Sequence, residues 1–324
     1  MRTYILILFT AALLFLNGCV SPQIKLFTDT SDPLQEFTLE GEEKGKVLVI
    51  PVNGFISDAP GTQFFRSKPS VVRTVVSQLR KAEKDDEIRA VLLKINSAGG
   101  TVTASDLLYH EIMAFKKRTG IKIAAVMMDI ATSGAYYISL PADFIMAHPT
   151  TITGSVGILF IRPRLNSLME KIGLDVEINK SGRNKDMGSL FRKPTEEEAE
   201  ILAHMVDELK ERFLNLVKVH RKVDQNALSR ISTARVCLAR EAQQLGLIDN
   251  IGYLSDAVLK AKSLAGLAPD AKVVVYRRTE YPDDNIYNTS VMNYNDGGNF
   301  SLIKMALPEA ITNLRTGFYY LWNR

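Results

Sequence analysis

Residues 46–54 read KVLVIPVNG, an apolar run in which both faces of an extended chain are hydrophobic. Parallel strands buried between two layers of helices have this composition. An amphipathic helix is predicted over 69–84, where Val75 and Leu79 recur at helical spacing, and residues 88–95, IRAVLLKI, form the next strand. Strand, helix and strand in this order predict a βαβ unit.

Strands and helices keep alternating along the rest of the chain, which predicts an α/β fold. A helix over 103–118 starts with Thr103 and Asp106 at capping-box spacing and stops at Gly120. The longest helix, over 196–221, carries an apolar stripe. Further strands are predicted over 121–128, 143–149, 175–180 and 271–278, and further helices over 165–171, 239–245 and 254–265.

Composition and charge describe a globular protein stabilised by its core. The chain has 324 residues, of which 46% are hydrophobic, so it can bury the core of one or two domains. Its two cysteines, Cys19 and Cys237, provide no disulfide framework. The net charge is +4 and acidic and basic residues are interspersed, so no nucleic-acid partner is expected.

The N-terminus has the order of an export signal. Arg2 precedes an apolar run over 4–16, and small residues stand before Cys19. Crossing a membrane needs about 20 apolar residues, so this shorter run predicts a cleavable signal. Leu16-Asn17-Gly18-Cys19 resembles a bacterial lipobox, in which cleavage before the cysteine leaves a thiol that is lipidated. We expect a lipoprotein signal peptide over 1–18; an ordinary signal peptide, with Cys19 there by chance, is the alternative.

Two polar segments flank the predicted α/β body. Residues 19–45 are polar and charged, which suits a tether, and the fold is expected to start near Lys46 and to extend over 46–280. Residues 281–324 form a polar, Asn-rich linker and an aromatic tail, which suits contact with a membrane, a partner or the active site. The aromatic residues of the tail are Phe318, Tyr319, Tyr320 and Trp322.

Three loops carry residue types that catalysis uses. NSAGG (96–100) follows a predicted strand, and its glycines let backbone N–H groups face an anion, although a plain tight turn is the simpler interpretation. Ser133 lies between a buried strand and a helix, outside any Gly-x-Ser-x-Gly elbow, where a helix cap is its simpler role. Lys185 lies in SGRNKDMGS (181–189). A lysine acts as a base only when it is desolvated and neutral, and most lysines are solvated.

The four histidines mainly exclude functions. His110, His204 and His220 lie on predicted helices and His148 ends a strand, and none stands in a metal-ligand spacing such as His-Glu-x-x-His. We therefore expect neither a zinc enzyme nor a metal site.

Four motifs in this order resemble the signal peptide peptidase A family. Each is weak alone, and the specificity comes from their agreement in spacing. The motifs are NSAGGTV (96–102), ATSGAYYIS (131–139), TGSVGIL (153–159) and SGRNKDMGS (181–189), and ARVCLAREAQQLGLIDNIG (234–252) is similar to the closing segment of the family. The resemblance covers roughly residues 46–265.

The resemblance implies roles for five residues. Ser133 corresponds to the nucleophile, Lys185 to the general base and Ser155 to the serine that hydrogen-bonds the lysine. Gly100 and Gly134 would supply the oxyanion-hole amides. Neutral Lys185 would take the proton from Ser133 as its oxygen attacks a peptide carbonyl.

The resemblance also implies a fold, an assembly and substrates. The family fold is that of the Clp protease and crotonase, a spiral of ββα units, here as one catalytic domain with a helical extension. Members form ring-shaped homo-oligomers with active sites at subunit boundaries and cleave remnant signal peptides and other apolar or unfolded peptides, bound as extended strands. With a lipid on Cys19, we expect an extracytoplasmic, membrane-anchored bacterial lipoprotein with serine peptidase activity and no cofactor.

Two departures and two alternatives accompany this interpretation. Ala98 stands where the family commonly has proline, which predicts a less preorganised oxyanion loop and weaker activity at most. Ala234 and Cys237 alter the start of the closing segment. A non-catalytic lipoprotein scaffold remains an alternative, as does a crotonase-like acyl-CoA enzyme, although CoA is cytosolic and this chain carries an export signal.

Overall fold

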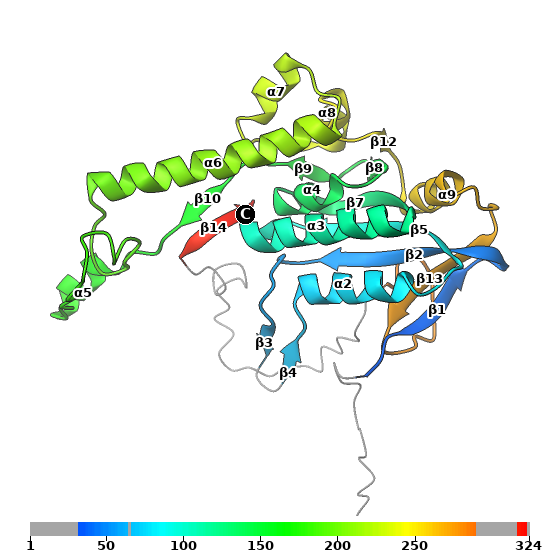
Figure 1. The fold of residues 1–324 in the computed structure, drawn as a ribbon, viewed down its shortest axis with the longest axis horizontal. Coiled ribbons are helices and arrows are strands. Elements are labelled where there is room, and N and C mark those ends of the chain that lie inside the picture. Colours follow the sequence, from blue (N-terminus) through cyan, green and yellow to red (C-terminus); the bar gives the residue numbers. More distant parts are fainter. Residues whose placement is uncertain (1–31, 64–65, 290–315, 323–324) are drawn as a thin grey trace, which may run out of the picture. The chain divides into compact units, whose positions relative to one another are not determined.

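A mostly parallel sheet of buried strands forms the centre of the fold (Figure 1). This computed structural model describes residues 32–63, 66–289 and 316–322, so the predicted signal peptide and Cys19 lie outside the described residues. The parallel neighbours in the sheet are β2 (Glu43–Asn53), β5 (Ile88–Ser97), β7 (Lys122–Thr132), β8 (Phe144–Ala147) and β12 (Asn250–Ile251).

The predicted βαβ unit is confirmed. Strands β2 and β5 pair in parallel, and helix α2 (Val71–Ala82) connects them after the short hairpin of β3 (Gly61–Gln63) and β4 (Arg66–Lys68). The helix begins where the Ser70 side chain accepts a hydrogen bond from the Arg73 N–H at 3.1 Å. It buries Val75 and Leu79, the apolar positions with helical spacing.

Helices cover both faces of the sheet because alternate residues of its strands point to opposite sides. Leu48, Ile50 and Leu93 share one apolar cluster with α2 and with α3 (Val102–Thr119). Val47 and Leu92 belong to a second cluster on the other face, against α9 (Leu254–Leu264). The remaining elements include α4 (Gly134–Ser139), β9 (Ile152–Gly154), α5 (Asn166–Ile172), α6 (Glu196–His220), α7 (Gln225–Ile231), β11 (Val236–Leu238) and α8 (Ala239–Gln244).

The fold begins earlier than the expected start near Lys46. Strand β1 (Gln35–Glu40) pairs antiparallel with β13 (Ala271–Arg277), which in turn pairs in parallel with β2. Part of the segment assigned to a tether is therefore a strand of the main sheet. Lys46 of β2 forms ion pairs with Glu36 of β1 at 2.9 Å and with Asp85 and Glu87, in the turn before β5, both at 3.0 Å.

A second prediction, the strand over 175–180, is wrong. These residues adopt no helix or strand, and Val176 and Ile178 are 41% and 40% exposed. Their alternating pattern resembles a strand, but no neighbouring edge pairs with them. The prediction of the long helix is confirmed by α6, which begins with a capping box of Thr195 and Glu198.

Part of the predicted C-terminal tail is a strand. Strand β14 (Gly317–Leu321) lies between β10 (Leu159–Ile161) and β6 (Gly99–Thr101) in a small antiparallel sheet. Residues 290–315 of the predicted linker lie outside the described residues. Among the described residues, no helix is both long and apolar enough to cross a membrane.

Replacing Lys46 tests how strongly the early strand β1 is tied to the sheet. Burial alone would lower the pKa of Lys46, but its hydrogen bonds with Glu36, Asp85 and Glu87 outweigh burial and raise it. Lys46→Met leaves three partly exposed carboxylates without their cation, so we expect a loss of about 1 to 2 kcal/mol in urea denaturation at pH 7. Lys44→Met, at an exposed position of the same strand, is the control and should change stability by less than about 0.5 kcal/mol.

The pH dependence of this loss has a defined sign. A raised lysine pKa contributes stability that persists until pH rises through the folded value, above 10.5, so the difference between the parent and Lys46→Met should still be present at pH 10. Burial by itself raises the pKa of Asp85, but the hydrogen bonds from Lys46 and the Glu87 N–H, together with the charge of Lys46, outweigh burial and lower it. The difference should therefore shrink as pH falls below 3.8, and a difference independent of acid would contradict the ion-pair assignment.

Candidate active site

Ser133 occupies the sharp turn between β7 and α4. Its φ is 54° and its ψ is −115°, a combination that glycine adopts readily and other residues rarely do. The residue is 1% exposed, its N–H donates to the Gly154 carbonyl at 2.8 Å, and its Oγ lies 3.5 Å from the Gly157 carbonyl. Strained backbone of this kind occurs at strand-to-helix turns that carry a nucleophile.

Neighbouring groups hold this turn in place. Thr132 Oγ1 donates to the Ala98 carbonyl at 3.1 Å, and Thr153 Oγ1 donates to the Ala131 carbonyl at 2.6 Å. All six residues of α4 are buried, so the chain after Ser133 is anchored in the core. The surroundings therefore hold the turn at Ser133 in place. The Ser133 side chain forms no hydrogen bond that caps α4, so it does not act as an ordinary helix cap.

The amides of Gly100 and Gly134 lie close together. A Cβ added to Gly134 would lie 3.2 Å from the Gly100 nitrogen and 2.4 Å from Ser105 Oγ. A Cβ added to Gly100 would lie only 1.9 Å from the Ile56 carbonyl oxygen. Both positions therefore require glycine, and two backbone N–H groups can be directed at one oxygen atom beside Ser133.

The loop before Gly100 is held without the proline that the family commonly has at Ala98. Ser97 Oγ donates to the Gly54 carbonyl at 2.6 Å and accepts from the Gly99 N–H at 3.1 Å. The Ala98 carbonyl accepts the hydrogen bond from Thr132 described above. These hydrogen bonds restrict the loop although Ala98 leaves its own φ free. The expectation of weaker activity at most stays a prediction.

Ser155 lies beside Ser133 at the ends of adjacent strands. Thr132 and Gly154 are paired residues of β7 and β9, and the two serines follow them. Ser155 also has a positive φ, 53°, is 8% exposed, and donates its N–H to the Arg235 carbonyl at 2.8 Å. The structure thus brings together four of the five residues singled out from the sequence.

The altered closing segment packs behind Ser155. Ala234 has a positive φ of 58°, and Cys237 is buried and opposite Thr153 in the pairing of β11 with β9. Burial raises the pKa of the Cys237 thiol to about 11, so it stays protonated and unreactive at neutral pH. The two unusual residues support the loop that carries Ser155.

Lys185 lies apart from this group. It is exposed, and it lies between α5 and α6, a segment that Figure 1 shows away from β7 and α4. The adjacent Asp186 accepts hydrogen bonds from Arg192 and Lys180, which hold the pKa of that carboxyl well below its usual range. Arg192 also pairs with the buried Glu198 in the first turn of α6, so the loop is tied to the start of this helix.

An aromatic cluster next to the serine turn was not predicted. The Tyr137 ring packs against Phe213 of α6 with ring centroids 4.8 Å apart, and its hydroxyl donates to Asp106 at 2.6 Å. Burial, and then the bond to Asp106, raise the pKa of Tyr137. Tyr137 lies in the motif ATSGAYYIS and Phe213 in the apolar stripe of the long helix, and neither pattern indicates that the two rings meet.

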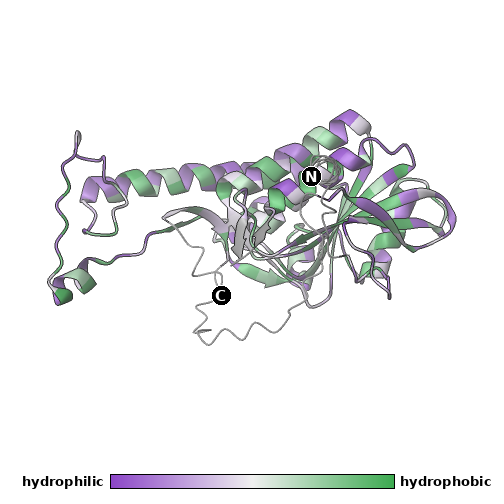
Figure 2. Ribbon diagram, turned by 90° about the horizontal axis from the view of Figure 1, so that it is seen from below, coloured by the Kyte–Doolittle hydropathy of each residue, from purple (hydrophilic) through white to green (hydrophobic). Residues whose placement is uncertain are grey.

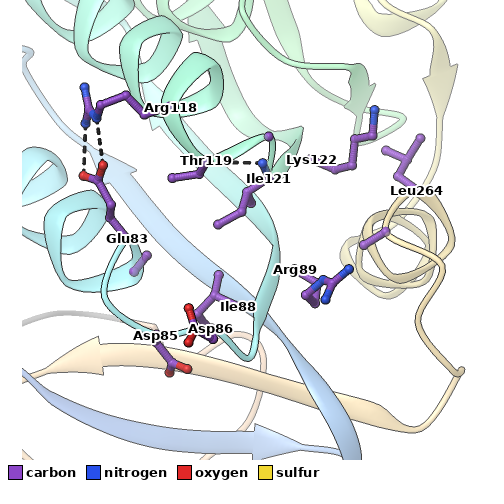
Figure 3. Close-up of a pocket in the computed structure, with 13 residues that line it drawn as sticks. Glu83, Asp85, Asp86, Ile88, Arg89, Arg118, Thr119, Ile121, Lys122 and Leu264 are labelled. Atoms are coloured by element: carbon purple, nitrogen blue, oxygen red, sulfur yellow. Dashed lines mark hydrogen bonds and ion pairs between the residues drawn. The ribbon is translucent and has the colours of Figure 1, made fainter.

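A separate hollow of about 490 Å³ lies at the other ends of the strands (Figure 3). Its lining includes Ile88 and Lys122, the first residues of β5 and β7, whereas Ser133 follows the last residue of β7. Glu83 and Arg118 form a two-bonded ion pair on its rim. Asp85, also in the lining, is paired with Lys46. Among the described residues, no group of acidic, histidine or cysteine side chains could hold a metal ion.

Comparisons with known proteins identify the family and the fold. A family model for peptidase family S49 matches residues 115–268, and a model for the Clp protease matches residues 66–153, which confirms the expected Clp protease/crotonase-like fold. A putative signal peptide peptidase SppA of Enterococcus faecium is 34% identical over 253 residues, covering 78% of this chain and 73% of the relative.

Two further relatives are also named as proteases. A putative protease of Methanocaldococcus jannaschii is 34% identical, covering 67% of this chain and 68% of the relative. A chloroplastic serine protease, SPPA of Arabidopsis thaliana, is 28% identical, covering 72% of this chain and 34% of the relative.

The strain at Ser133 predicts an unusual order of stabilities. Glycine relieves a positive φ that alanine retains, so Ser133→Gly should be more stable than Ser133→Ala by about 1 kcal/mol in urea denaturation. At exposed Ser229, inside α7, the order should be reversed, with glycine less stable than alanine by about 1 kcal/mol. If alanine were the more stable substitution at both positions, the turn at Ser133 would not be strained.

Proposed function

Because the chain belongs to peptidase family S49 and is a serine protease, we propose that it is an endopeptidase in which Ser133 is the nucleophile and Lys185 the general base. The observation that carries this proposal is the strained, buried turn at Ser133 beside the converging amides of Gly100 and Gly134. That combination provides both an oriented nucleophile and donors for an oxyanion.

The reaction proceeds in two stages. Neutral Lys185 takes the proton of Ser133 Oγ as this oxygen attacks the peptide carbonyl, and the Gly100 and Gly134 N–H groups stabilise the oxyanion. Lys185 then gives the proton to the departing amine and an ester remains on Ser133. Water, deprotonated by the same lysine, hydrolyses that ester. Ser155 orients the lysine amine.

Lys185 reaches Ser133 from a second copy of the chain in this proposal. It is exposed, and the segment that carries it includes hydrophobic stretches (Figure 2). Several of its large apolar side chains are exposed, consistent with a surface that another copy covers. Burial in such a contact is also what keeps a lysine amine neutral. The exposed apolar residues of this segment are Leu165, Leu168, Ile172, Leu174, Val176, Ile178, Phe191 and Met205. We infer a homo-oligomeric ring with shared active sites.

The proposed substrates are remnant signal peptides and other apolar or unfolded peptides. Substrate would bind as an extended strand beside β6, in the place where β14 pairs with it, and the Gly100 amide would then meet the carbonyl to be attacked. A lipid on Cys19 would hold the enzyme at the extracytoplasmic membrane surface, where such peptides accumulate. The alternative is a non-catalytic scaffold, for which the strain at Ser133 would have no use.

Two substitutions test the dyad on the purified full chain in detergent. Ser133→Ala and Lys185→Ala should each reduce hydrolysis of an apolar peptide by about 10³-fold or more, because each removes a group that acts in the transition state. Exposed Lys193→Ala, from the same segment, is the matched control and should retain activity. Full activity in Ser133→Ala would overturn the dyad, and failure of a fluorophosphonate to label Ser133 in the parent would favour the scaffold.

Co-expression of the two inactive variants tests whether Lys185 acts on the serine of a second copy of the chain. If Lys185 acts on the serine of a neighbour, random mixing restores about one quarter of the sites in a ring, because each needs an intact serine beside an intact lysine. If Lys185 serves the serine of its own chain, the mixed assembly stays inactive. Size-exclusion chromatography with light scattering should give a mass of several chains.

Labelled palmitate tests the anchor. In a bacterial host the parent chain should incorporate the label and sediment with membranes, because the cysteine of a lipobox is acylated. Cys19→Ser should lose the label, whereas Cys237→Ser, at the buried cysteine, should keep it. Equal labelling of all three chains would exclude Cys19 as the lipid site.

A further inference from the structure

A buried ion pair lies at the start of α6. Glu198 is 0% exposed and accepts two hydrogen bonds from Arg192, one of them from Nη1 to Oε2 at 2.8 Å. The Thr195 N–H donates to the same carboxylate at 3.0 Å as part of the capping box. A buried carboxylate requires such partners, and the planar guanidinium offers them in a fixed geometry. Glu198 therefore holds Arg192 in one orientation.

Arg192 in turn holds Asp186, the residue that follows Lys185. Its Nε donates to Oδ2 of Asp186 at 2.7 Å and its Nη2 to Oδ1 at 2.8 Å, a two-bonded arrangement that fixes the direction of a carboxylate. Lys180 Nζ donates to the same Oδ1 at 2.7 Å. The side chain of Asp186 is only 11% exposed, so two cations hold a largely buried carboxylate beside the lysine.

The turn is also closed on the other side of Lys185. The Lys185 N–H donates to the Gly182 carbonyl at 3.1 Å. Glu197, in the first turn of α6, accepts from the Asn184 amide at 3.2 Å and from the Arg183 guanidinium at 2.6 Å. Asn184 is half-buried whereas Lys185 is exposed. The bonds on both sides therefore restrict the backbone that carries the lysine and leave its side chain facing outward.

We propose that Glu198, Arg192 and Asp186 are positioning residues for the general base, which hold the turn so that Lys185 is oriented before it meets Ser133 of a second copy. The inference rests on the proposed function and names the device that orients its base. A displacement of about 1 Å can reduce a rate by about 10²-fold, so a lysine on an unrestrained loop would serve another chain poorly. The attachment to the first turn of α6 prevents that displacement.

The charges of this network act on the base as well. A carboxylate beside an amine favours the protonated form of the amine, and neighbouring cations favour the neutral form. Asp186 is next to Lys185 in the chain, and Lys180 and Arg192 offset its charge. The remaining charged groups bonded to the turn or to Arg192 are themselves paired, and they are Arg183, Glu197 and Glu198. Removal of the negative charge or of one positive charge should therefore have opposite effects on the base.

Two substitutions test these effects on the purified full chain in detergent. Asp186→Asn keeps the size of the side chain but leaves the two cations uncompensated, so the midpoint of the acid limb of kcat/KM should fall by about 0.5 pH unit or more. Lys180→Met removes a cation at the surface and should raise the midpoint by a similar amount. Asp186→Asn should also lower kcat by about tenfold or more while KM changes by less than about threefold, because the turn orients the base.

Arg118→Gln is the matched control. It removes a two-bonded ion pair with Glu83 at the opposite ends of the strands, and it should leave both kcat and the acid limb unchanged. A loss of folded enzyme lowers the rate at every pH without moving the limb. An unshifted limb in Asp186→Asn, or shifts of the same sign in Asp186→Asn and Lys180→Met, would overturn the inference.

Co-expression separates positioning from assembly. In mixed assemblies of Ser133→Ala and Lys185→Ala chains, the first chain supplies the lysine and the second supplies the serine. Asp186→Asn on the chain that supplies Lys185 should lower the activity of the mixture by about tenfold or more. The same substitution on the chain that supplies Ser133 should leave the activity within about twofold. Equal losses in the two arrangements contradict a positioning role.

Hydrogen exchange tests the network without catalysis. The Met187 N–H donates to the Asn184 carbonyl at 3.1 Å, and the Ser189 N–H donates to the Asp186 carbonyl at 2.9 Å. Both amides should exchange about tenfold faster or more in Asp186→Asn than in the parent chain, whereas Arg118→Gln should not change them. If the parent cleaves no peptide, the proposed function fails, and exchange alone decides whether the network holds the turn. Equal exchange in the parent and Asp186→Asn overturns the inference whatever the activity.

Discussion

The backbone turn at Ser133 is the constraint on which the rest of the site depends. The last residues of β7 are paired on both sides, with β5 at Ser97 and with β9 at Gly154, so the chain must leave the sheet within one residue. The positive φ of Ser133 makes that exit and places Gly134 beside Gly100. Strain of about 1 to 3 kcal/mol persists only where neighbours over-determine the geometry, and the buried helix α4 and the bonded Thr132 do so.

Most of the central fold could be predicted from the sequence because its signals are local. Buried parallel strands are apolar on both faces, and the N-cap residues Ser70 and Thr195 mark the starts of α2 and α6. Strand β1 was missed because its sequence, QEFTLE, is as polar as a tether, and its partner β13 is distant in the chain. Residues 175–180 show the reverse error, since an alternating pattern forms a strand only where a partner edge exists.

The candidate site was predictable to the extent that motifs carry it. Ser133, Ser155, Gly100 and Gly134 each follow a strand of one sheet, and the carboxyl ends of parallel strands meet at one edge. The aromatic cluster could not be derived this way, because Tyr137, Phe213 and Tyr320 come from three segments that no local pattern relates. Whether a lysine such as Lys185 is buried depends on what packs against it. The apolar periodicity of one chain does not indicate this.

The position of β14 between β6 and β10 also bears on solubility. Without β14, these two strands would present two rows of unpaired N–H and C=O groups, and such edges recruit strands from other molecules. While β14 lies there, both rows are paired, and Tyr319 and Leu321 are buried. A chain that has lost this segment would therefore be prone to edge-to-edge aggregation, so the C-terminal strand protects the protein against self-association.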